Sequence, residues 1–261
     1  MKAGFIQTEP IFGDKEKNFR AVLALTGSTK ADLLVLPELF ATGYSFVSKE
    51  EAMAMAEPTG GVTTRFLKEL SVKTGAIVVG GFVESNDEGN IFNSSLIISD
   101  ENLVGTYRKI HLFNKEKQWF TPGDKKPEVY NIRGIRLGVM ICFDWIFPEV
   151  TRSLALKGMQ VLAHPSNLVL HFCQTAMVTR CLENRIFAVT ANRVGRERRG
   201  EDDFTFTGGS QVTGFGGDIL TKAPDDTALI SVIEFNEKET ENKMINPFND
   251  LLGDRRPEFY F

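Results

Sequence analysis

The chain has 261 residues, of which 42% are hydrophobic and 25% are charged, as in a large soluble α/β domain. Its 30 basic and 34 acidic residues give a net charge of −4, which argues against a nucleic-acid-binding surface. No apolar run has the length of a secretory signal, and none approaches the roughly eighteen residues of a membrane span.

The first half of the chain alternates between strand-like and helix-like segments. Apolar runs predict strands at 3–10, 31–39 and 76–84, and amphipathic patterns predict helices at 14–30 and 63–75. Each of two longer segments, 93–109 and 128–142, has the pattern of two strands joined by a turn. The turns are expected at 100–102 and at 133–134.

The second half continues the alternation. Helices are predicted at 148–158 and 173–185, with a short polar helix at 236–244. Strands are predicted at 159–166, 186–195, 208–215 and 227–235, and the Gly-rich stretch 195–217 is otherwise expected to be irregular. These segments indicate one α/β domain over 1–261 with mixed sheets covered by helices, ending in a tail at 245–261.

The three cysteines, Cys142, Cys173 and Cys181, are an odd number and lack CxxC spacing. This pattern argues against a disulfide framework or a zinc site, and no other metal-ligand spacing appears. We therefore expect a cytoplasmic protein without a metal. Cys173 and Cys181 share one face of a predicted helix, so we interpret them as packing residues.

Three chemically distinct side chains follow predicted core strands. Glu38 comes after "LLVLP", Lys109 comes two residues after Tyr107, and Cys142 comes directly after "GVMI". Each has an ordinary interpretation: a capping residue, a solvated lysine and a small buried hydrophobe. Together they place an acid, an amine and a thiol at strand exits, where α/β folds gather their sites.

These three residue types fit one chemistry, which is attack by a thiolate on a carbonyl carbon. A neighbouring ammonium lowers the pKa of a thiol, and a neighbouring carboxylate can accept its proton. The oxyanion that forms could be held by Lys109 and by the backbone N–H of Phe143. Each such donor is worth roughly 2.7–4 kcal/mol.

Three segments carry a resemblance to a known family. "LPELFATGY", "YRKIHLF" and "GVMICFDWIFPE" resemble the signature segments of the nitrilase superfamily, the carbon–nitrogen hydrolases. "HPSN", "RCLENRIFAVTANRVG" and "FTGGSQV" resemble its later landmarks, in the expected order. The resemblance implies a four-layer α-β-β-α sandwich of two mixed sheets, and a triad of Glu38, Lys109 and Cys142. It also implies a second glutamate, Glu116, and a homodimer to which the C-terminal tail contributes.

Several further residues are candidates for the pocket. Tyr44 and Trp119 lie in predicted loops near the triad and could line it, with core packing as the alternative. We also assign Asn167, in "HPSN", to substrate binding. His164 of the same segment is expected to support a loop below the site rather than to act in catalysis.

The predicted activity is hydrolysis of a small aliphatic amide through a Cys thioester, with release of ammonia and no cofactor. A nitrilase and an N-carbamoyl-amide hydrolase are alternatives that the sequence does not separate firmly. A catalytically silent binding scaffold is the alternative from another class, and the complete triad argues against it. The expected partners are the small amide or nitrile and a second copy of the chain, without nucleic acid or membrane.

Overall fold

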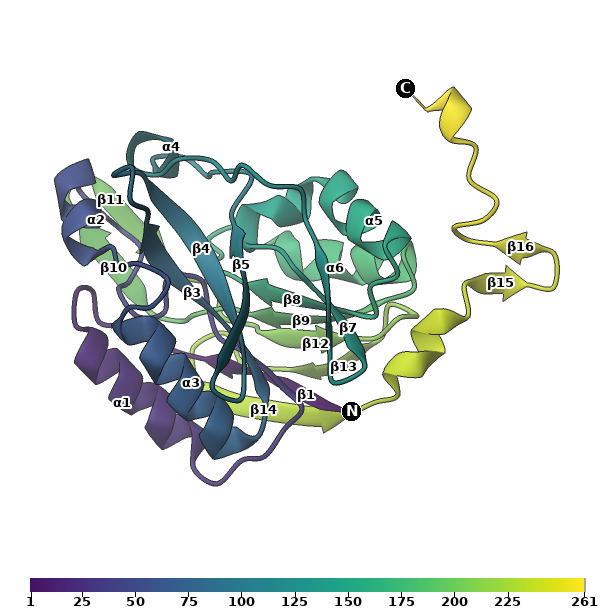
Figure 1. Cartoon of the computed structure of the whole chain (residues 1–261), viewed down its shortest axis with the longest axis horizontal. Helices are drawn as coiled ribbons and strands as arrows, with labels where there is room; N and C mark the ends of the chain where they lie inside the picture. Colours follow the sequence, from purple (N-terminus) through teal and green to yellow (C-terminus); the bar gives the residue numbers. More distant parts are fainter. Residues whose placement is uncertain (261) are drawn as a thin grey trace.

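Two six-stranded sheets form the framework of the computed structural model, which describes residues 1–260 (Figure 1). The first sheet has the order β14 (Leu229–Glu234), β1 (Lys2–Gln7), β2 (Leu33–Val35), β3 (Ile77–Ser85), β4 (Ile91–Ser99), β5 (Asn102–Arg108). The second has the order β13 (Ile219–Lys222), β12 (Gln211–Thr213), β9 (Phe187–Ala191), β8 (Val161–Pro165), β7 (Ile135–Val139), β6 (Val129–Ile132).

Both sheets are mixed. In the first, β1, β2 and β3 run parallel, and β14, β4 and β5 add antiparallel neighbours. In the second, β7, β8 and β9 run parallel, and β6, β12 and β13 add antiparallel neighbours. The parallel core of each sheet brings several strand ends to one edge, where side chains from distant parts of the chain can meet.

Side-chain alternation explains why the sheets stack. In β2, Leu33 and Val35 belong to the core cluster between the sheets, whereas Leu34 belongs to the cluster under the helices. Because both faces of these strands are buried, their sequences are continuous apolar runs. The first cluster also continues through the second sheet to α5 and α6, so the two clusters together fill all three interfaces of a layered fold.

Helices cover the outer faces. α1 (Lys15–Thr26) and α3 (Val62–Thr74) pack on the first sheet, where the rings of Phe19 and Phe66 stack at 4.2 Å. α5 (Pro148–Leu156) and α6 (Cys173–Leu182) cover the second sheet (Figure 1). The predicted α-β-β-α sandwich of two mixed sheets is therefore confirmed.

Some elements differ from the predictions. α2 (Lys49–Met55), the short α4 (Glu116–Trp119) and the hairpin of β10 (Arg196–Arg199) and β11 (Asp202–Thr205) were not predicted. The first helix ends at Thr26 because Gly27 turns with a φ of 51°. The polar segment 236–244 contains only a 3₁₀ turn at Glu237–Glu241 rather than a helix.

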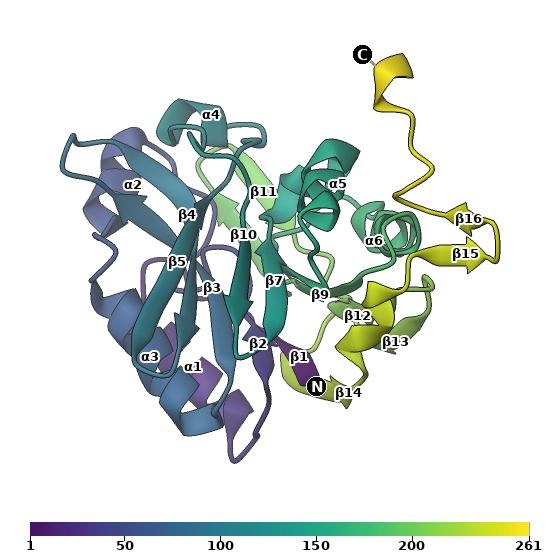
Figure 2. The same cartoon turned by 45° about the vertical axis from the view of Figure 1, so that its right-hand side comes forward.

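The segment after this turn leaves the sandwich. It forms the small hairpin of β15 (Met244–Asn246) and β16 (Asn249–Asp250), and then a 3₁₀ turn at Pro257–Phe259. Figures 1 and 2 show it projecting away from the layers on the side of α5 and α6. No helix within residues 1–260 combines the length and the apolar content that a membrane crossing requires.

Candidate active site

The three residues predicted at strand ends meet at one edge of the sandwich. Glu38 follows β2, Lys109 follows β5 directly, and Cys142 follows β7. Lys109 Nζ lies 2.7 Å from Glu38 Oε1 and 2.8 Å from Glu116 Oε1, so one ammonium joins two carboxylates. The charges of all three groups influence the pKa of Cys142, which places the thiol within the same cluster.

The two carboxylate oxygens of Glu38 have different surroundings. Oε1 accepts hydrogen bonds from Lys109 Nζ and, at 2.7 Å, from Asn93 Nδ2. Oε2 is buried and has no hydrogen-bond partner within residues 1–260. An unpartnered carboxylate oxygen is costly to bury and keeps its lone pairs available to accept a proton.

A glycine lets the Glu38 segment approach the first sheet. A Cβ on Gly81 of β3 would lie 2.5 Å from the backbone N of Leu39 and 2.7 Å from the Cα of Glu38. Any larger residue would push the Glu38 backbone away from the sheet. Asn93, on the neighbouring β4, would then lose its hydrogen bond to the carboxylate.

Lys109, Glu116 and Tyr44 form a second buried chain of polar groups. The Tyr44 hydroxyl donates a 2.6 Å hydrogen bond to the Glu116 oxygen that also accepts from Lys109. Burial raises the pKa of Glu116 to about 7, although the Lys109 ammonium opposes that shift. Burial also opposes the charge of Lys109, but the two carboxylates outweigh it, and the pKa of Lys109 lies above its ordinary value.

Tyr44 is itself held by the unpredicted hairpin. The backbone N–H groups of Tyr44 and Ser45 donate to Glu197 of β10, at 3.1 and 2.8 Å. Arg193 forms a buried ion pair with the same carboxylate. The hairpin therefore fixes the loop from which the Tyr44 hydroxyl reaches Glu116.

Cys142 begins a tight turn. Its φ is 41°, a left-handed conformation that is unusual for a residue with a side chain, and residues Cys142–Ile146 form a 3₁₀ turn before α5. This geometry corresponds to the predicted change from strand to helix at the thiol. Burial raises the pKa of Cys142 well above its usual value, and Glu38 raises it further, whereas Lys109 lowers it. The resting group is therefore a thiol.

Asp144 joins the turn to the lysine segment. Its Oδ2 accepts from the Ile141 N–H at 3.0 Å and from the Tyr107 hydroxyl at 2.7 Å. Its Oδ1 accepts from the His111 N–H at 3.0 Å and lies 2.8 Å from His111 Nδ1. Tyr107 and His111 flank Lys109 by two residues on either side, so one buried carboxylate sets the lysine relative to the thiol.

A small, mostly apolar pocket opens beside the thiol. It is lined by Cys142 and by Phe113, Phe143, Trp145, Asn167, Leu168, Val169 and Leu170. Its volume of about 20 Å³ leaves room for little more than a water molecule. Both amide atoms of Asn167 are buried without a partner in the described part of the chain. Asn167 and Phe143 thus line the same pocket as the thiol.

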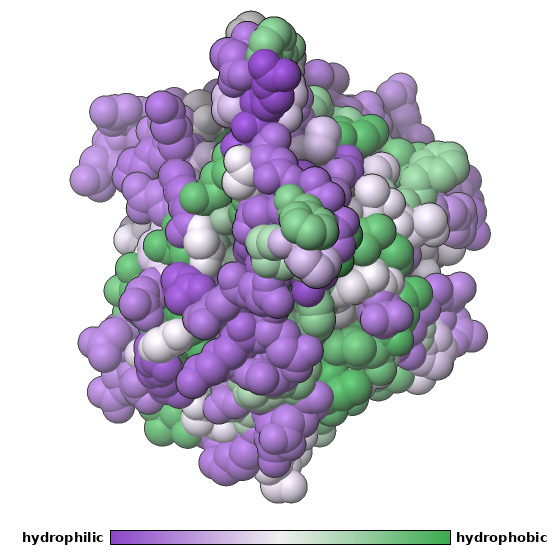
Figure 3. All heavy atoms as spheres, turned by 90° about the vertical axis from the view of Figure 1, so that its right-hand side faces the viewer, coloured by the Kyte–Doolittle hydropathy of each residue, from purple (hydrophilic) through white to green (hydrophobic). Residues whose placement is uncertain are grey.

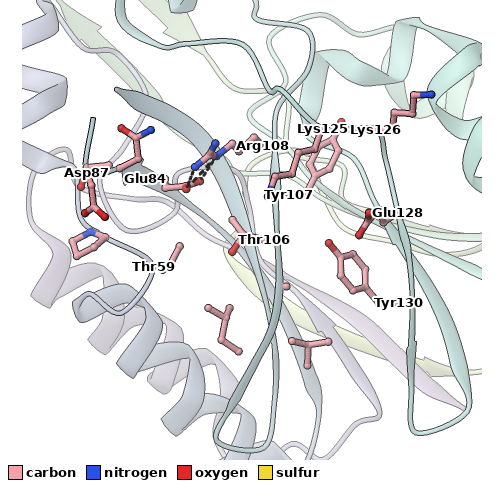
Figure 4. A pocket seen from close by; sticks show the side chains of 16 residues that line it. Thr59, Glu84, Asp87, Thr106, Tyr107, Arg108, Lys125, Lys126, Glu128 and Tyr130 are labelled. Atoms are coloured by element: carbon pink, nitrogen blue, oxygen red, sulfur yellow. Dashed lines mark hydrogen bonds and ion pairs between the residues drawn. The ribbon is translucent and has the colours of Figure 1, made fainter. Parts of the chain in front are cut away.

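Tyr44 and Trp119 line a different small pocket, which lies next to Glu116 and Phe204. Figure 4 shows a third and larger pocket, of about 600 Å³, between β5 and the segment 125–130. There Arg108 forms a 2.6 Å ion pair with Glu84. None of the predicted site residues lines this larger pocket.

Sequence reasoning did not identify Asn93, Asp144 or Glu197 as part of the site. Asn93 carried a usable signal, because "NSS" interrupts an otherwise apolar strand and a buried polar group needs partners. Asp144 and Glu197 carried no such signal in the sequence, because the groups that they bind, such as Tyr107 and the Ser45 N–H, are distant along the chain.

The fold and this cluster define a cysteine-containing hydrolase of the α-β-β-α type. Residues 2–242 match the sequence profile of the carbon-nitrogen hydrolase family, and the chain belongs to this family, within the nitrilase superfamily. It is 40% identical over 265 residues to a protein named nitrilase from Pyrococcus abyssi, covering 100% of this chain and 99% of that protein.

A second relative carries a different name. An (R)-stereoselective amidase from a Pseudomonas species is 35% identical over 266 residues, covering 98% of this chain and 92% of that protein. The crystal structure of a carbon-nitrogen hydrolase from Helicobacter pylori G27 superposes with a TM-score of 0.89 at 28% identity, covering 100% and 97% of the two chains. The chain is therefore a hydrolase of carbon–nitrogen bonds, and its relatives include proteins named nitrilase and amidase.

Proposed function

We propose that the protein hydrolyses small aliphatic amides, with Cys142 as the nucleophile, Glu38 as the general base and acid, and Lys109 as an oxyanion donor. The observation that carries the proposal is the free Oε2 of Glu38. Lys109 and Asn93 occupy the other oxygen, so the carboxylate is held in place with one oxygen left to accept a proton. The raised pKa of the thiol fits a base that removes the proton only as attack begins.

The proposed reaction has two halves. Glu38 accepts the Cys142 proton while sulfur bonds to the amide carbon, and the carbonyl electron pair becomes an oxyanion facing Lys109 and the Phe143 N–H. The C–N bond then breaks, nitrogen takes the proton from Glu38, and ammonia leaves a thioester. Water next gives a proton to Glu38 and attacks the thioester. The C–S bond breaks to release the acid, and sulfur regains the proton.

Glu116 and Tyr44 have a supporting part in this scheme. Because Glu116 and Glu38 both accept hydrogen bonds from Lys109 Nζ, together they hold the ammonium in the position where we propose that it meets the oxyanion. Asn167 is proposed to bind a polar group of the substrate with its unpartnered amide. Trp119 lies in the neighbouring pocket with Tyr44, so we propose that it shapes this side of the site rather than touches the acyl group.

The chemistry of the pocket lining favours a small uncharged acyl group, and the pocket must widen beyond its volume of about 20 Å³ to admit one. Its lining is aromatic and aliphatic apart from Cys142 and Asn167, and it contains no arginine or lysine that could pair with a substrate carboxylate. A nitrile is the second candidate, because one relative is named nitrilase. The two substrates need the same thiolate and differ in the donors that they use after attack.

We also propose that the protein acts as a homodimer whose contact includes the C-terminal tail. Phe248, Phe259 and Tyr260 are 91%, 67% and 50% exposed, and on the nearby helices Leu156 and Leu182 are 46% and 53% exposed. The face that carries the tail mixes apolar with polar surface (Figure 3). Apolar residues gathered in this way are typical of a contact surface. Phe261, the last residue of the predicted tail, lies outside the described residues.

The proposal is tested with Cys142→Ala and an ammonia-release screen over short aliphatic amides, carbamoyl compounds and matched nitriles. We expect turnover to fall at least about a thousandfold in the variant, the scale on which nucleophile removal acts. Mass spectrometry should find a covalent acyl adduct on the parent protein and none on the variant. Cys173→Ala, which changes a buried thiol outside the cluster, serves as the control and should retain the adduct. Substantial turnover by Cys142→Ala would sink the proposal.

A further inference from the structure

His164 is a buried histidine whose ring contacts the backbone of Cys142. Its Nε2 lies 3.0 Å from the Cys142 carbonyl oxygen, and its Nδ1 lies 3.2 Å from the Thr190 hydroxyl. The ring is inaccessible to solvent. It comes from β8, the strand that pairs with β7 of the Cys142 segment, so the histidine is anchored in the sheet below the turn.

These contacts assign the tautomer. The Cys142 carbonyl can only accept, so Nε2 carries the hydrogen and donates it, and Nδ1 accepts from Thr190. Ser166 Oγ lies 3.0 Å from the same Nε2. The Ser166 hydroxyl can donate its hydrogen to the His164 carbonyl at 3.3 Å, so its oxygen can accept from the ring N–H. Burial lowers the pKa of His164 to about 4, although the contact with the Cys142 carbonyl opposes that shift, so the ring is neutral at assay pH.

The bonded carbonyl belongs to the peptide unit whose N–H is that of Phe143. In a trans peptide the C=O and N–H point in opposite directions, so a bond to the carbonyl fixes the direction of the N–H. In the described part of the chain the Phe143 N–H has no acceptor. Cys142 also has a φ of 41°, a conformation that is unfavourable for a non-glycine residue and persists only where the surroundings hold it.

We infer that His164 is a positioning residue for the oxyanion site: by holding the Cys142 carbonyl from below, it aims the Phe143 N–H at the oxygen of the reacting carbonyl. The hydrogen bond also polarises the peptide unit and makes its N–H a stronger donor. This inference rests on the proposed function, in which Cys142 is the nucleophile of amide hydrolysis. It adds a residue that touches neither substrate nor thiol and acts through one peptide plane.

Two reactions of the Cys142 thiol should respond differently to the loss of His164. Amide hydrolysis passes through an oxyanion, whereas alkylation by iodoacetamide displaces iodide and forms none. Loss of the His164 donor should therefore lower kcat and leave the alkylation rate of Cys142 nearly unchanged. Because the oxyanion exists only after attack, KM should change little while kcat falls.

The experiment compares His164→Leu and His164→Met, which remove the donor, with His164→Gln, whose amide nitrogen can reach the position of Nε2. We expect kcat to fall about tenfold to a hundredfold in the first two, less than the loss seen when an oxyanion donor is removed outright. KM and the alkylation rate should stay within about threefold of the parent, and His164→Gln should recover most of the lost kcat. Ser71→Ala, which removes a buried 2.6 Å hydrogen bond under the other sheet, controls for general destabilisation and should keep the parent kcat.

Two results would overturn the inference. One is a kcat for His164→Leu and His164→Met within twofold of the parent. The other is a fall of kcat and alkylation by the same factor, which would mean that His164 only supports the local packing. Failure of the proposed function would look different, because the parent protein itself would then release no ammonia from any amide or nitrile and form no acyl adduct.

Discussion

Lys109 Nζ donates a 2.7 Å hydrogen bond to Glu38 Oε1, and neither side chain is exposed to solvent. Two charges removed from water lose much of their hydration, and Glu116 and Asn93 offset part of that loss by hydrogen bonds to Lys109 Nζ and Glu38 Oε1. The ammonium therefore balances two carboxylates and the thiolate that forms during attack. Its removal would affect the whole cluster.

Lys109→Met keeps the length of the side chain and removes its charge. We expect loss of detectable activity, because the oxyanion and the thiolate both lose their cation. We also expect slower alkylation of Cys142 near neutral pH, since Lys109 is the group that lowers the pKa of this thiol while Glu38 raises it. Alkylation as fast as in the parent protein would show that Lys109 does not tune the thiol. Lys117→Met, in the same segment but outside the cluster, is the matched control.

Glu116→Gln tests whether the pKa of Glu116 is raised in the folded protein, through the pH dependence of the free energy of unfolding. The folded pKa of Glu116, about 7, lies above its ordinary value of 4.5, so the folded protein holds a proton there that the unfolded chain loses between these pH values. This carboxyl therefore makes the free energy of unfolding decrease as pH rises from 4.5 to 7, by up to about 1.4 kcal/mol per pH unit. The contribution is fully present below pH 4.5 and absent above pH 7.

The glutamine variant should lack this contribution. Urea unfolding of parent and variant from pH 4 to pH 8 should give a stability difference that moves in favour of the variant between pH 4.5 and 7 and is constant outside that range. A difference independent of pH would mean that folding leaves the pKa of Glu116 at its ordinary value. Glu149→Gln, on the exposed start of α5, is the control and should follow the parent.

The sheets and the three central residues of the site could be predicted because short apolar runs in the sequence mark the strands that these residues follow. Apolar runs mark strands β2 and β7, and the site residues that follow β2, β5 and β7 lie within three residues of the strand ends, at one edge of the sandwich. The hairpin β10–β11 could not be predicted in this way. Its sequence, "RERRGEDDFT", has charged side chains on both faces, and it is held by pairs such as Arg196 with Asp203 rather than by apolar alternation.

The interactions around the site were less predictable than its three central residues. A sequence shows that Asp144 follows the thiol, but not that its carboxylate reaches Tyr107, which lies 37 residues earlier. The pKa of Cys142 illustrates the same limit. A neighbouring lysine was expected to lower it, and Lys109 does act in that direction, but the depth of burial outweighs the lysine.

The tail prediction concerns assembly. Light scattering should give the mass of at least a dimer for the full chain. A chain ending at Arg256, which removes the exposed Phe259 and Tyr260, should shift the equilibrium toward monomer. A monomeric parent would refute the dimer, and an unchanged dimer after truncation would refute the part of the tail. Val72→Ser, on the outer surface of α3 at 54% exposure, removes apolar surface elsewhere and should leave the assembly unaltered.

The preference between amide and nitrile depends on where the charge appears after attack. An amide forms a tetrahedral adduct at once, with an oxyanion that can use both Lys109 and the Phe143 N–H. A nitrile is linear and forms a planar thioimidate, so its nitrogen lies along the attack axis and reaches these donors less well. We therefore expect kcat/KM for a matched short aliphatic pair to be at least about tenfold higher for the amide, a difference of about 1.4 kcal/mol in transition-state binding.

The same donors provide an internal check on this preference. His164→Leu, which is expected to misdirect the Phe143 N–H, should reduce the rate for the amide more than the rate for the nitrile, and the ratio between them should shrink. Ammonia release from both members of each pair, measured under identical conditions in parent and variant, gives the two ratios. A nitrile that is faster across the whole series would replace the amidase assignment with a nitrilase. A ratio that His164→Leu leaves unaltered would mean that the N–H of Phe143 does not discriminate between the substrates, and that Lys109 alone sets the preference.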